Sequence, residues 1–171
     1  MLKQKLTQAL SDQVNAEYYS AYIYLSMSAA ADGMGLKGFA NWLFAQAQEE
    51  MAHGTNIYEY ILERGATPTF EAIDKPPTSF ASINEIFDIA LAHEQEVTKS
   101  INDIATLAML EHDHACYQFM MWYVNEQVEE EASATEVLDK LKLIGDNKGL
   151  LLSIDKELAT RVFVNPFTIN E

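Results

Sequence analysis

Four long stretches of this chain have helical periodicity, and each carries one acidic residue in the middle of its apolar stripe. The acidic residues are Glu17, Glu50, Glu94 and Glu130. A carboxylate on the core side of a helix is unfavourable unless it is paired or holds a metal ion. The middle positions of four packed helices fall in one layer, so the four carboxylates should converge there. Without cations they would repel one another strongly, and the sequence therefore predicts a metal site.

The four stretches are recognised by apolar residues at steps of three and four. They cover residues of about 5–32, 36–64, 83–110 and 114–144. Gly33, Gly65 and Gly145 stand at or just past the ends of these stretches, as is common where helices stop. We expect an all-α chain that forms a single domain over residues 1–171. It consists of a four-helix bundle over about 5–145 and a short C-terminal helix over about 149–160.

The connection between the second and third stretches is long and contains three of the four prolines, Pro68, Pro76 and Pro77. Its 17 residues, 65–81, span about 55 Å when extended. A helix of about 29 residues is about 43 Å long. The connection can therefore run the length of the bundle, which predicts a long crossover and permits the second and third helices to be parallel. Ser82 and Glu85 are spaced as a capping box at the start of the third helix.

Composition limits the possible partners. The chain has 26 acidic and 11 basic residues, for a formal net charge of −15. This balance argues against binding nucleic acid or an anionic membrane surface, and it suits a protein that attracts cations. Cys116 is the only cysteine, so an intrachain disulfide and a cysteine-rich metal site are excluded. The first ten residues do not resemble a secretory signal, and no apolar run has the length of a membrane span, so we expect a cytoplasmic protein.

Glu50 and His53 form a Glu-x-x-His motif, which places both side chains on one helix face within reach of one ion. Carboxylates with a single imidazole suit iron or manganese, or zinc in substitution. Several carboxylates that share two ions fit this pattern better than a closed structural zinc site. In such a site Glu50 and Glu94 can bridge, Glu17 with His53 can hold one ion, and Glu130 can hold the other.

With these residues in place, the chain resembles the bacterial non-haem ferritins over essentially its whole length. The matching segments are Glu17-Tyr18, Glu49 to His53, Glu94, and Glu126 to Glu130. Ferritin-like bundles are the known example of carboxylates from facing helices that hold two irons. The resemblance implies a ferroxidase centre that oxidises Fe(II) with dioxygen. Its first iron would be held by Glu17, Glu50 and His53, and its second by Glu50, Glu94 and Glu130, with Gln127 beside them.

The resemblance also implies three further features. A third iron position maps to Glu49, Glu126, Glu129 and Glu130, although a solvated acidic face would have the same residues. Tyr24 becomes the tyrosine near the iron pair that can supply an electron, although a core tyrosine fits the sequence equally well. The family stores its product as a ferric mineral in a homo-oligomeric shell of 24 subunits, and the fifth helix belongs to that assembly.

Four alternatives stay open. A bacterioferritin stores iron with haem between subunits, and Met51 stands where a haem ligand would be expected. That family carries a second Glu-x-x-His on the fourth helix, whereas this chain has Gln127-x-x-Glu130, and we expect no haem. A small DNA-protecting relative is disfavoured by the fifth helix and the acidity, and a di-iron oxidase acting on an organic substrate by the single Glu-x-x-His. The last alternative is a structural bundle without chemistry.

Overall fold

The computed structural model describes residues 1–167, and all of its regular structure in that range is helical. The helices are α1 (Gln4–Gly33), α2 (Lys37–Glu63), α3 (Ile83–Leu110), α4 (His114–Ile144) and α5 (Lys148–Leu158). The predicted all-α class is confirmed, and the first four helices have nearly the predicted bounds. None of the helices within residues 1–167 is long and apolar enough to cross a membrane. Residues 168–171 lie outside the described residues.

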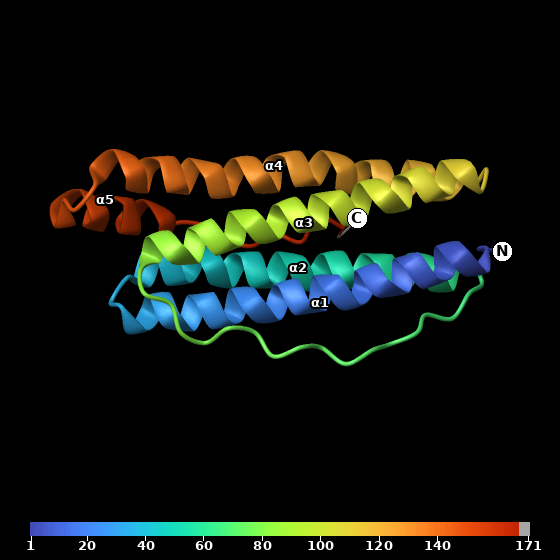
Figure 1. The fold of residues 1–171 in the computed structure, drawn as a ribbon, viewed down its shortest axis with the longest axis horizontal. Coiled ribbons are helices and arrows are strands. Elements are labelled where there is room, and N and C mark those ends of the chain that lie inside the picture. Colours follow the sequence, from blue (N-terminus) through green and yellow to red (C-terminus); the bar gives the residue numbers. More distant parts are fainter. Residues whose placement is uncertain (168–171) are drawn as a thin grey trace.

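The four long helices lie side by side, with α1 against α2 and α3 against α4 (Figure 1). The predicted crossover between α2 and α3 runs back along the bundle, so α2 and α3 point in the same direction, as its length permits (Figure 1). Three hydrogen bonds hold this connection on α1, and one of them runs from Gln8 Nε2 to Thr69 Oγ1 at 3.4 Å. The Thr69 amide donates to Ser11 Oγ at 3.1 Å, and Ser26 Oγ donates to the Pro77 carbonyl at 2.5 Å.

The predicted helix boundaries have identifiable causes. Ser82 Oγ accepts a hydrogen bond from the Glu85 amide at 3.2 Å, and the Glu85 carboxylate accepts one from the Ala81 amide. This is a variant of the expected capping box. Gly65 follows α2 with a φ of 70°, and Gly145 follows α4 with a φ of 52°. Both conformations are left-handed, where a side chain would be strained, so glycine is required at these two helix ends.

The fifth helix begins earlier than predicted. The sequence predicts a helix over about 149–160, whereas Lys148 is already helical and α5 ends at Leu158. The reason is that Asn147 is an N-cap, since its side-chain oxygen accepts from the amides of Gly149 at 3.0 Å and Leu150 at 3.2 Å. Ile154 and Leu158 of α5 are buried against the same chain, while Leu152 stays half exposed.

The core is divided in two along the helix axes. One apolar cluster contains the end of α1, the start of α2, the start of α3, the end of α4, and α5. The other contains the opposite ends of the four long helices, with Leu6, Ile57, Ile101 and Met120 among its members. The positions between the two clusters on each helix are those of the predicted carboxylates. The fold therefore places the polar layer at the middle of the bundle with apolar packing on either side.

Gly38 makes the docking of α5 on α2 possible. A Cβ at this position would lie 1.5 Å from the backbone oxygen of Asp155. The Gly38 amide also donates to Asp155 Oδ1 at 2.7 Å. The two backbones therefore approach each other more closely than any side chain at position 38 permits.

We predict that Gly38→Ala displaces α5 from α2 and destabilises that contact by about 2 kcal/mol or more. Hydrogen exchange of residues 148–158 is the measurement, and faster exchange there is expected. Gly33→Ala is the matched control, because no atom lies within 4 Å of a Cβ placed there. Unchanged exchange of α5 in the Gly38 variant would contradict this account.

Candidate metal centre

The four predicted carboxylates are all buried in the middle of the bundle. Glu17 and Glu94 are 1% exposed, Glu50 is 2% exposed and Glu130 is 5% exposed. They come from α1, α3, α2 and α4 respectively. His53 of α2, at 2% exposure, is buried with them. Carboxylates are almost never this buried without a compensating partner.

The buried side chains form groups compact enough to hold an ion. One group is Glu17, Glu50 and His53, and another is Glu50, Glu94 and Glu130. Within each group, one ligand atom from each residue lies within 4.8 Å of the others. Glu50 belongs to both groups, so its carboxylate is placed to contact two ions at once. This is the arrangement expected of a bridging ligand.

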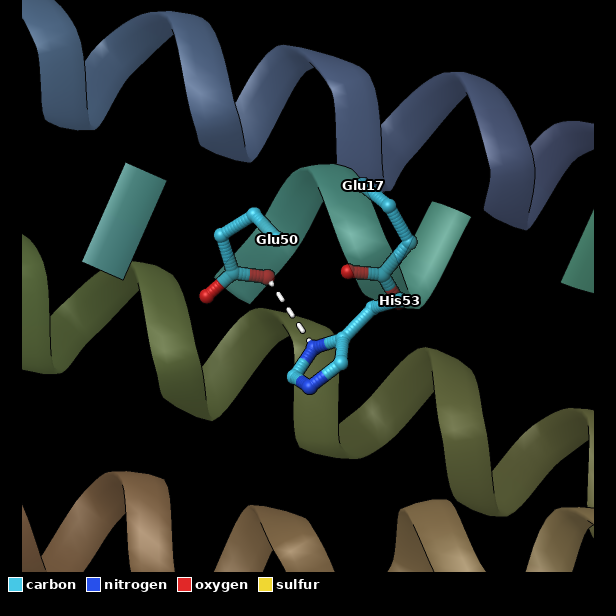
Figure 2. Close-up of side chains that lie close together, drawn as sticks. All are labelled: Glu17, Glu50 and His53. Atoms are coloured by element: carbon cyan, nitrogen blue, oxygen red, sulfur yellow. Dashed lines mark ion pairs between the residues drawn. The ribbon is translucent and has the colours of Figure 1, made fainter. Parts of the chain in front are cut away.

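Glu50 and His53 lie against each other on α2, and Glu17 reaches them from α1 (Figure 2). His53 Nδ1 is 3.4 Å from Glu50 Oε2. Two other atoms, Glu17 Oε2 and His53 Nε2, are buried and have no hydrogen-bond partner among the described residues. A buried polar atom without a partner is unfavourable, and a bound cation would satisfy the carboxylate oxygen.

Two glutamines orient the carboxylates. Gln13 Nε2 donates to Glu17 Oε1 at 2.8 Å, and Gln46 Nε2 donates to Glu50 Oε1 at the same distance. Gln46 Nε2 also donates to Glu130 Oε2 at 2.7 Å. Neither glutamine was predicted from the sequence to have a role. The signal that was available is the repeated spacing, since each glutamine stands four residues before the glutamate that it contacts.

Gln127 and Tyr24 both contact Glu94. Gln127 Nε2 lies 3.2 Å from Glu94 Oε2 and 3.3 Å from Thr98 Oγ1. The Tyr24 hydroxyl donates to Glu94 Oε1, and the tyrosine side chain is 1% exposed. Both residues therefore lie at the centre, next to a carboxylate of the second group. Their contribution to chemistry stays a prediction.

The predicted third position is only partly assembled. Glu126 joins His53 and Glu130 in a further group with ligand atoms within 4.8 Å. Glu129 is exposed and belongs to none of the three groups. Glu49 is paired with Arg161, whose Nη2 lies 2.6 Å from Glu49 Oε2. The contact between Arg161 and Glu49 could not be predicted from the sequence, because the two residues lie far apart along the chain.

Aromatic rings surround the imidazole of His53. The centroid of the Trp122 ring is 5.5 Å from that of His53, and that of Phe167 is 6.0 Å away. The Tyr123 hydroxyl donates to the His53 carbonyl at 3.0 Å. These contacts fix the orientation of the imidazole and reduce the access of water to it.

Burial and mutual charge shift the pKa values of the centre. Burial, together with the charge of Glu50, raises the pKa of Glu94 to about 8. Burial also raises the pKa values of Glu17 and Glu130 well above the usual range, with Glu50 again adding to the effect. Burial opposes ionisation of both Glu50 and His53. Their mutual attraction outweighs it, so the pKa of Glu50 is lowered and that of His53 is raised to about 10. The centre therefore holds protons at neutral pH that a cation would displace.

Comparison with known proteins identifies the family of this helical bundle. Residues 7–144 match the ferritin-like domain family. The chain belongs to the ferritin family. It is 42% identical over 163 residues to the bacterial non-heme ferritin of Staphylococcus aureus strain MRSA252, covering 95% of this chain and 98% of the relative. It is 44% identical to the bacterial non-heme ferritin of Staphylococcus saprophyticus over the same shares.

Solved ferritin structures agree with the fold. An engineered closed form of the Archaeoglobus fulgidus ferritin superposes with a TM-score of 0.94 at 45% identity, covering 96% of this chain and 100% of that chain. The open-pore ferritin of the same archaeon superposes with a TM-score of 0.93 at 46% identity, covering 94% and 98%. The resemblance to bacterial non-haem ferritins is therefore confirmed, and so is the ferritin-like bundle with its crossover and fifth helix.

Proposed function

We propose that this ferritin oxidises Fe(II) with dioxygen at the buried centre and stores the product as a ferric mineral. The observation that carries the proposal is the position of Glu50 in two ligand groups within one bundle. Two ions that share a carboxylate can be oxidised as a pair. The names of the bacterial relatives, which are non-heme ferritins, support iron as the metal.

In the proposed reaction the chain supplies binding and charge. Glu17 and His53 hold one Fe(II), Glu94 and Glu130 hold the other, and Glu50 contacts both. The anionic oxygens favour Fe(III) over Fe(II), because the ion of higher charge gains more from them. The pair gives two electrons to one dioxygen, which takes up two protons and leaves as hydrogen peroxide. Tyr24, which contacts Glu94, is placed to supply an electron if the reduction of dioxygen goes beyond hydrogen peroxide.

Storage requires an enclosed volume that one bundle lacks. We propose that subunits form a 24-subunit shell, and that Fe(III) leaves the centre, hydrolyses and precipitates inside it. Exposed apolar side chains support burial against neighbouring subunits, among them Leu150 and Leu152 of α5 at 49% and 54% exposure. The third iron position and the cytoplasmic location stay predictions.

The test is to add Fe(II) to the purified apoprotein in air and measure oxygen uptake and mass in solution. We expect about one dioxygen consumed for every two Fe(II). We also expect a particle with the mass of about 24 chains that keeps the oxidised iron in solution. A monomer would contradict the proposal, and so would an assembly that oxidises Fe(II) no faster than buffer alone.

The same sample also tests the alternative of a haem-containing bacterioferritin. Met51 is 49% exposed and lies beside Tyr18, Ala21 and Leu25 on the surface of the α1–α2 pair. A strong Soret absorption band in the purified protein would favour a bacterioferritin. We expect none, because Gln127 replaces the first residue of the second Glu-x-x-His that accompanies haem in that family.

A further inference from the structure

The chain after α5 returns to the middle of the bundle. Residues 161–167 follow α5 without forming a helix or strand, and partly buried side chains alternate with exposed ones along them. The partly buried side chains are those of Arg161, Phe163, Asn165 and Phe167. This alternation is that of an extended segment lying on a surface. Arg161 is the only cationic residue of the segment, so the segment brings one positive charge back toward the carboxylates.

α2 holds Arg161 in place by both its backbone and its side chain. Asn41 Nδ2 donates to the Arg161 carbonyl at 2.9 Å and to the Leu158 carbonyl at 3.3 Å. The guanidinium carbon lies 4.3 Å from the centroid of the Trp42 ring, which is a cation–π contact. Arg161 is therefore anchored at the end of α5 by two residues that belong to none of the ligand groups.

The guanidinium of Arg161 determines which way the Gln46 amide faces. Arg161 Nη2 donates to Gln46 Oε1 at 2.7 Å. A guanidinium only donates hydrogen bonds, and a carboxylate that holds a metal ion only accepts them. The amide between them therefore has one favourable orientation, with its oxygen toward Arg161 and its nitrogen toward the metal centre.

The Gln46 side chain is fully buried, and its nitrogen holds two ligands at once. Nε2 donates to Glu50 Oε1 at 2.8 Å and to Glu130 Oε2 at 2.7 Å. Both carboxylates belong to the ligand group that also contains Glu94. In the other buried group of carboxylates, Glu50 is the only member that Gln46 contacts. A loss of the amide orientation should therefore disturb one ion of the pair more than the other.

We propose that Arg161 is a positioning residue, which acts through Gln46 to hold two carboxylate ligands in place for one ion of the pair. This inference rests on the proposed iron chemistry of the same centre. Charge alone predicts the opposite result, because a cation beside the centre repels a metal ion and its removal would tighten binding. Loss of an outer partner of the ligands instead weakens metal binding, by about ten- to a hundredfold. The direction of the change therefore separates the two roles.

The first test is calorimetric titration of the purified apoprotein with Zn(II), a redox-inert probe, in the unsubstituted protein and in Arg161→Met. Methionine keeps an unbranched apolar stem beside Trp42 but has no donor for Gln46. We expect two strongly bound ions per subunit in the unsubstituted protein. In the variant, one of the two should bind about tenfold more weakly and the other should change much less. Circular dichroism and particle mass verify that the variant folds and assembles.

Lys140→Met is the matched control. Lys140 lines the same surface cleft as Arg161, but its ion pairs are with Glu136 and Glu157. Its removal also deletes a positive charge near α5, and we expect both ions to bind within about threefold of their original affinities. Arg161→Lys keeps a cationic donor at the original position and should recover most of the affinity that methionine loses.

The part played by Gln46 is tested in the Gln46→Leu background. There, Arg161→Met should weaken neither ion further, because the effects of residues that act through one another are not additive. A further loss as large as in the unsubstituted protein would overturn the inference. So would unchanged or tighter binding in Arg161→Met alone, an equal loss in Lys140→Met, or an Arg161→Lys variant that binds no better than the methionine variant.

A crystal structure of the Arg161→Met variant grown with Zn(II) gives a second readout, which identifies the affected ion. We expect the Gln46 amide to adopt more than one conformation. Zinc occupancy should be reduced between Glu94 and Glu130 and retained beside His53. Equal occupancy of the two positions with an unchanged Gln46 would contradict the positioning role.

Failure of this inference is distinguishable from failure of the proposed function. Absence of two strongly bound Zn(II) ions in the unsubstituted protein would overturn the proposed centre itself. Two strong ions whose binding is insensitive to Arg161→Met would overturn only the positioning role of Arg161.

Discussion

Replacing Glu50 by alanine is expected to slow Fe(II) oxidation by on the order of a hundredfold or more. Glu50 is the only residue common to the two buried groups that contain Glu17 and Glu94. Its removal therefore takes a ligand from both ions and loosens the pairing on which two-electron transfer depends. His53 also loses the neighbour whose hydrogen bond and charge raise its pKa to about 10, and that pKa should fall.

The measurement is the initial rate of oxygen uptake after Fe(II) addition, with circular dichroism and particle mass recorded on the same samples. Glu59→Ala is the matched control, because Glu59 is an exposed glutamate on the same helix. A folded Glu50 variant that oxidises Fe(II) within twofold of the unsubstituted rate would exclude the proposed centre. It would favour the reading of the chain as a bundle without chemistry.

Binding of a redox-inert divalent ion at pH 7 is expected to raise the melting temperature by about 10 °C or more. A ligand present at a hundred times its dissociation constant stabilises by about 2.7 kcal/mol per site. For two sites in a chain of this size, this stabilisation corresponds to a rise in melting temperature of about 10–20 °C, at roughly 2–4 °C per kcal/mol. The ion also relieves the repulsion between buried carboxylates, which the apoprotein can relieve only by keeping protons.

The effect should grow with pH. Glu94 has its pKa raised from 4.5 to about 8 and His53 from 6.5 to about 10. In the apoprotein the folded state therefore binds more protons than the unfolded state, Glu94 between pH 4.5 and about 8 and His53 between 6.5 and about 10. The stability from these protonated groups is fully present below the unfolded pKa values and is lost as pH rises through the folded ones.

Ions that bind must displace the protons on Glu94 and His53, so at least two protons per subunit should appear in weakly buffered solution at neutral pH. The measurements are thermal melts with and without Zn(II) between about pH 6 and pH 8, and proton release followed with an indicator dye. A larger stabilisation at pH 6 than at pH 8, or binding without proton release, would contradict the assigned pKa shifts.

Several parts of the centre are predictable because helical periodicity is a local property. Glu17, Glu50, Glu94 and Glu130 stand on apolar stripes, and their burial follows once the four stripes face one another. The spacing of Glu50 and His53 within one helix brings them together without any knowledge of the rest of the fold. The same logic would have found Gln46, which precedes Glu50 by one turn on the same stripe.

Other parts are decided by contacts between segments that are distant in the chain. Arg161 lies 112 positions from Glu49, and no spacing rule connects them. Its position depends on the Asn147 cap that starts α5, and on Gly38, which lets α5 approach α2. Residues 161–167 form no regular element, so their alternate burial against α2 and α4 becomes visible only in the folded chain.

By itself, the sequence determined the four-helix bundle, its long crossover and the carboxylate layer, because side-chain chemistry and helix period act over a few residues. Only the tertiary structure decided which glutamines orient the ligands, and that the segment after α5 returns to the centre. These features depend on how whole helices pack and on backbone approaches as close as that at Gly38. The sharing of Glu50 by two groups of ligands was thus expected from the sequence, whereas the contact of the Arg161 guanidinium with Glu49 was not.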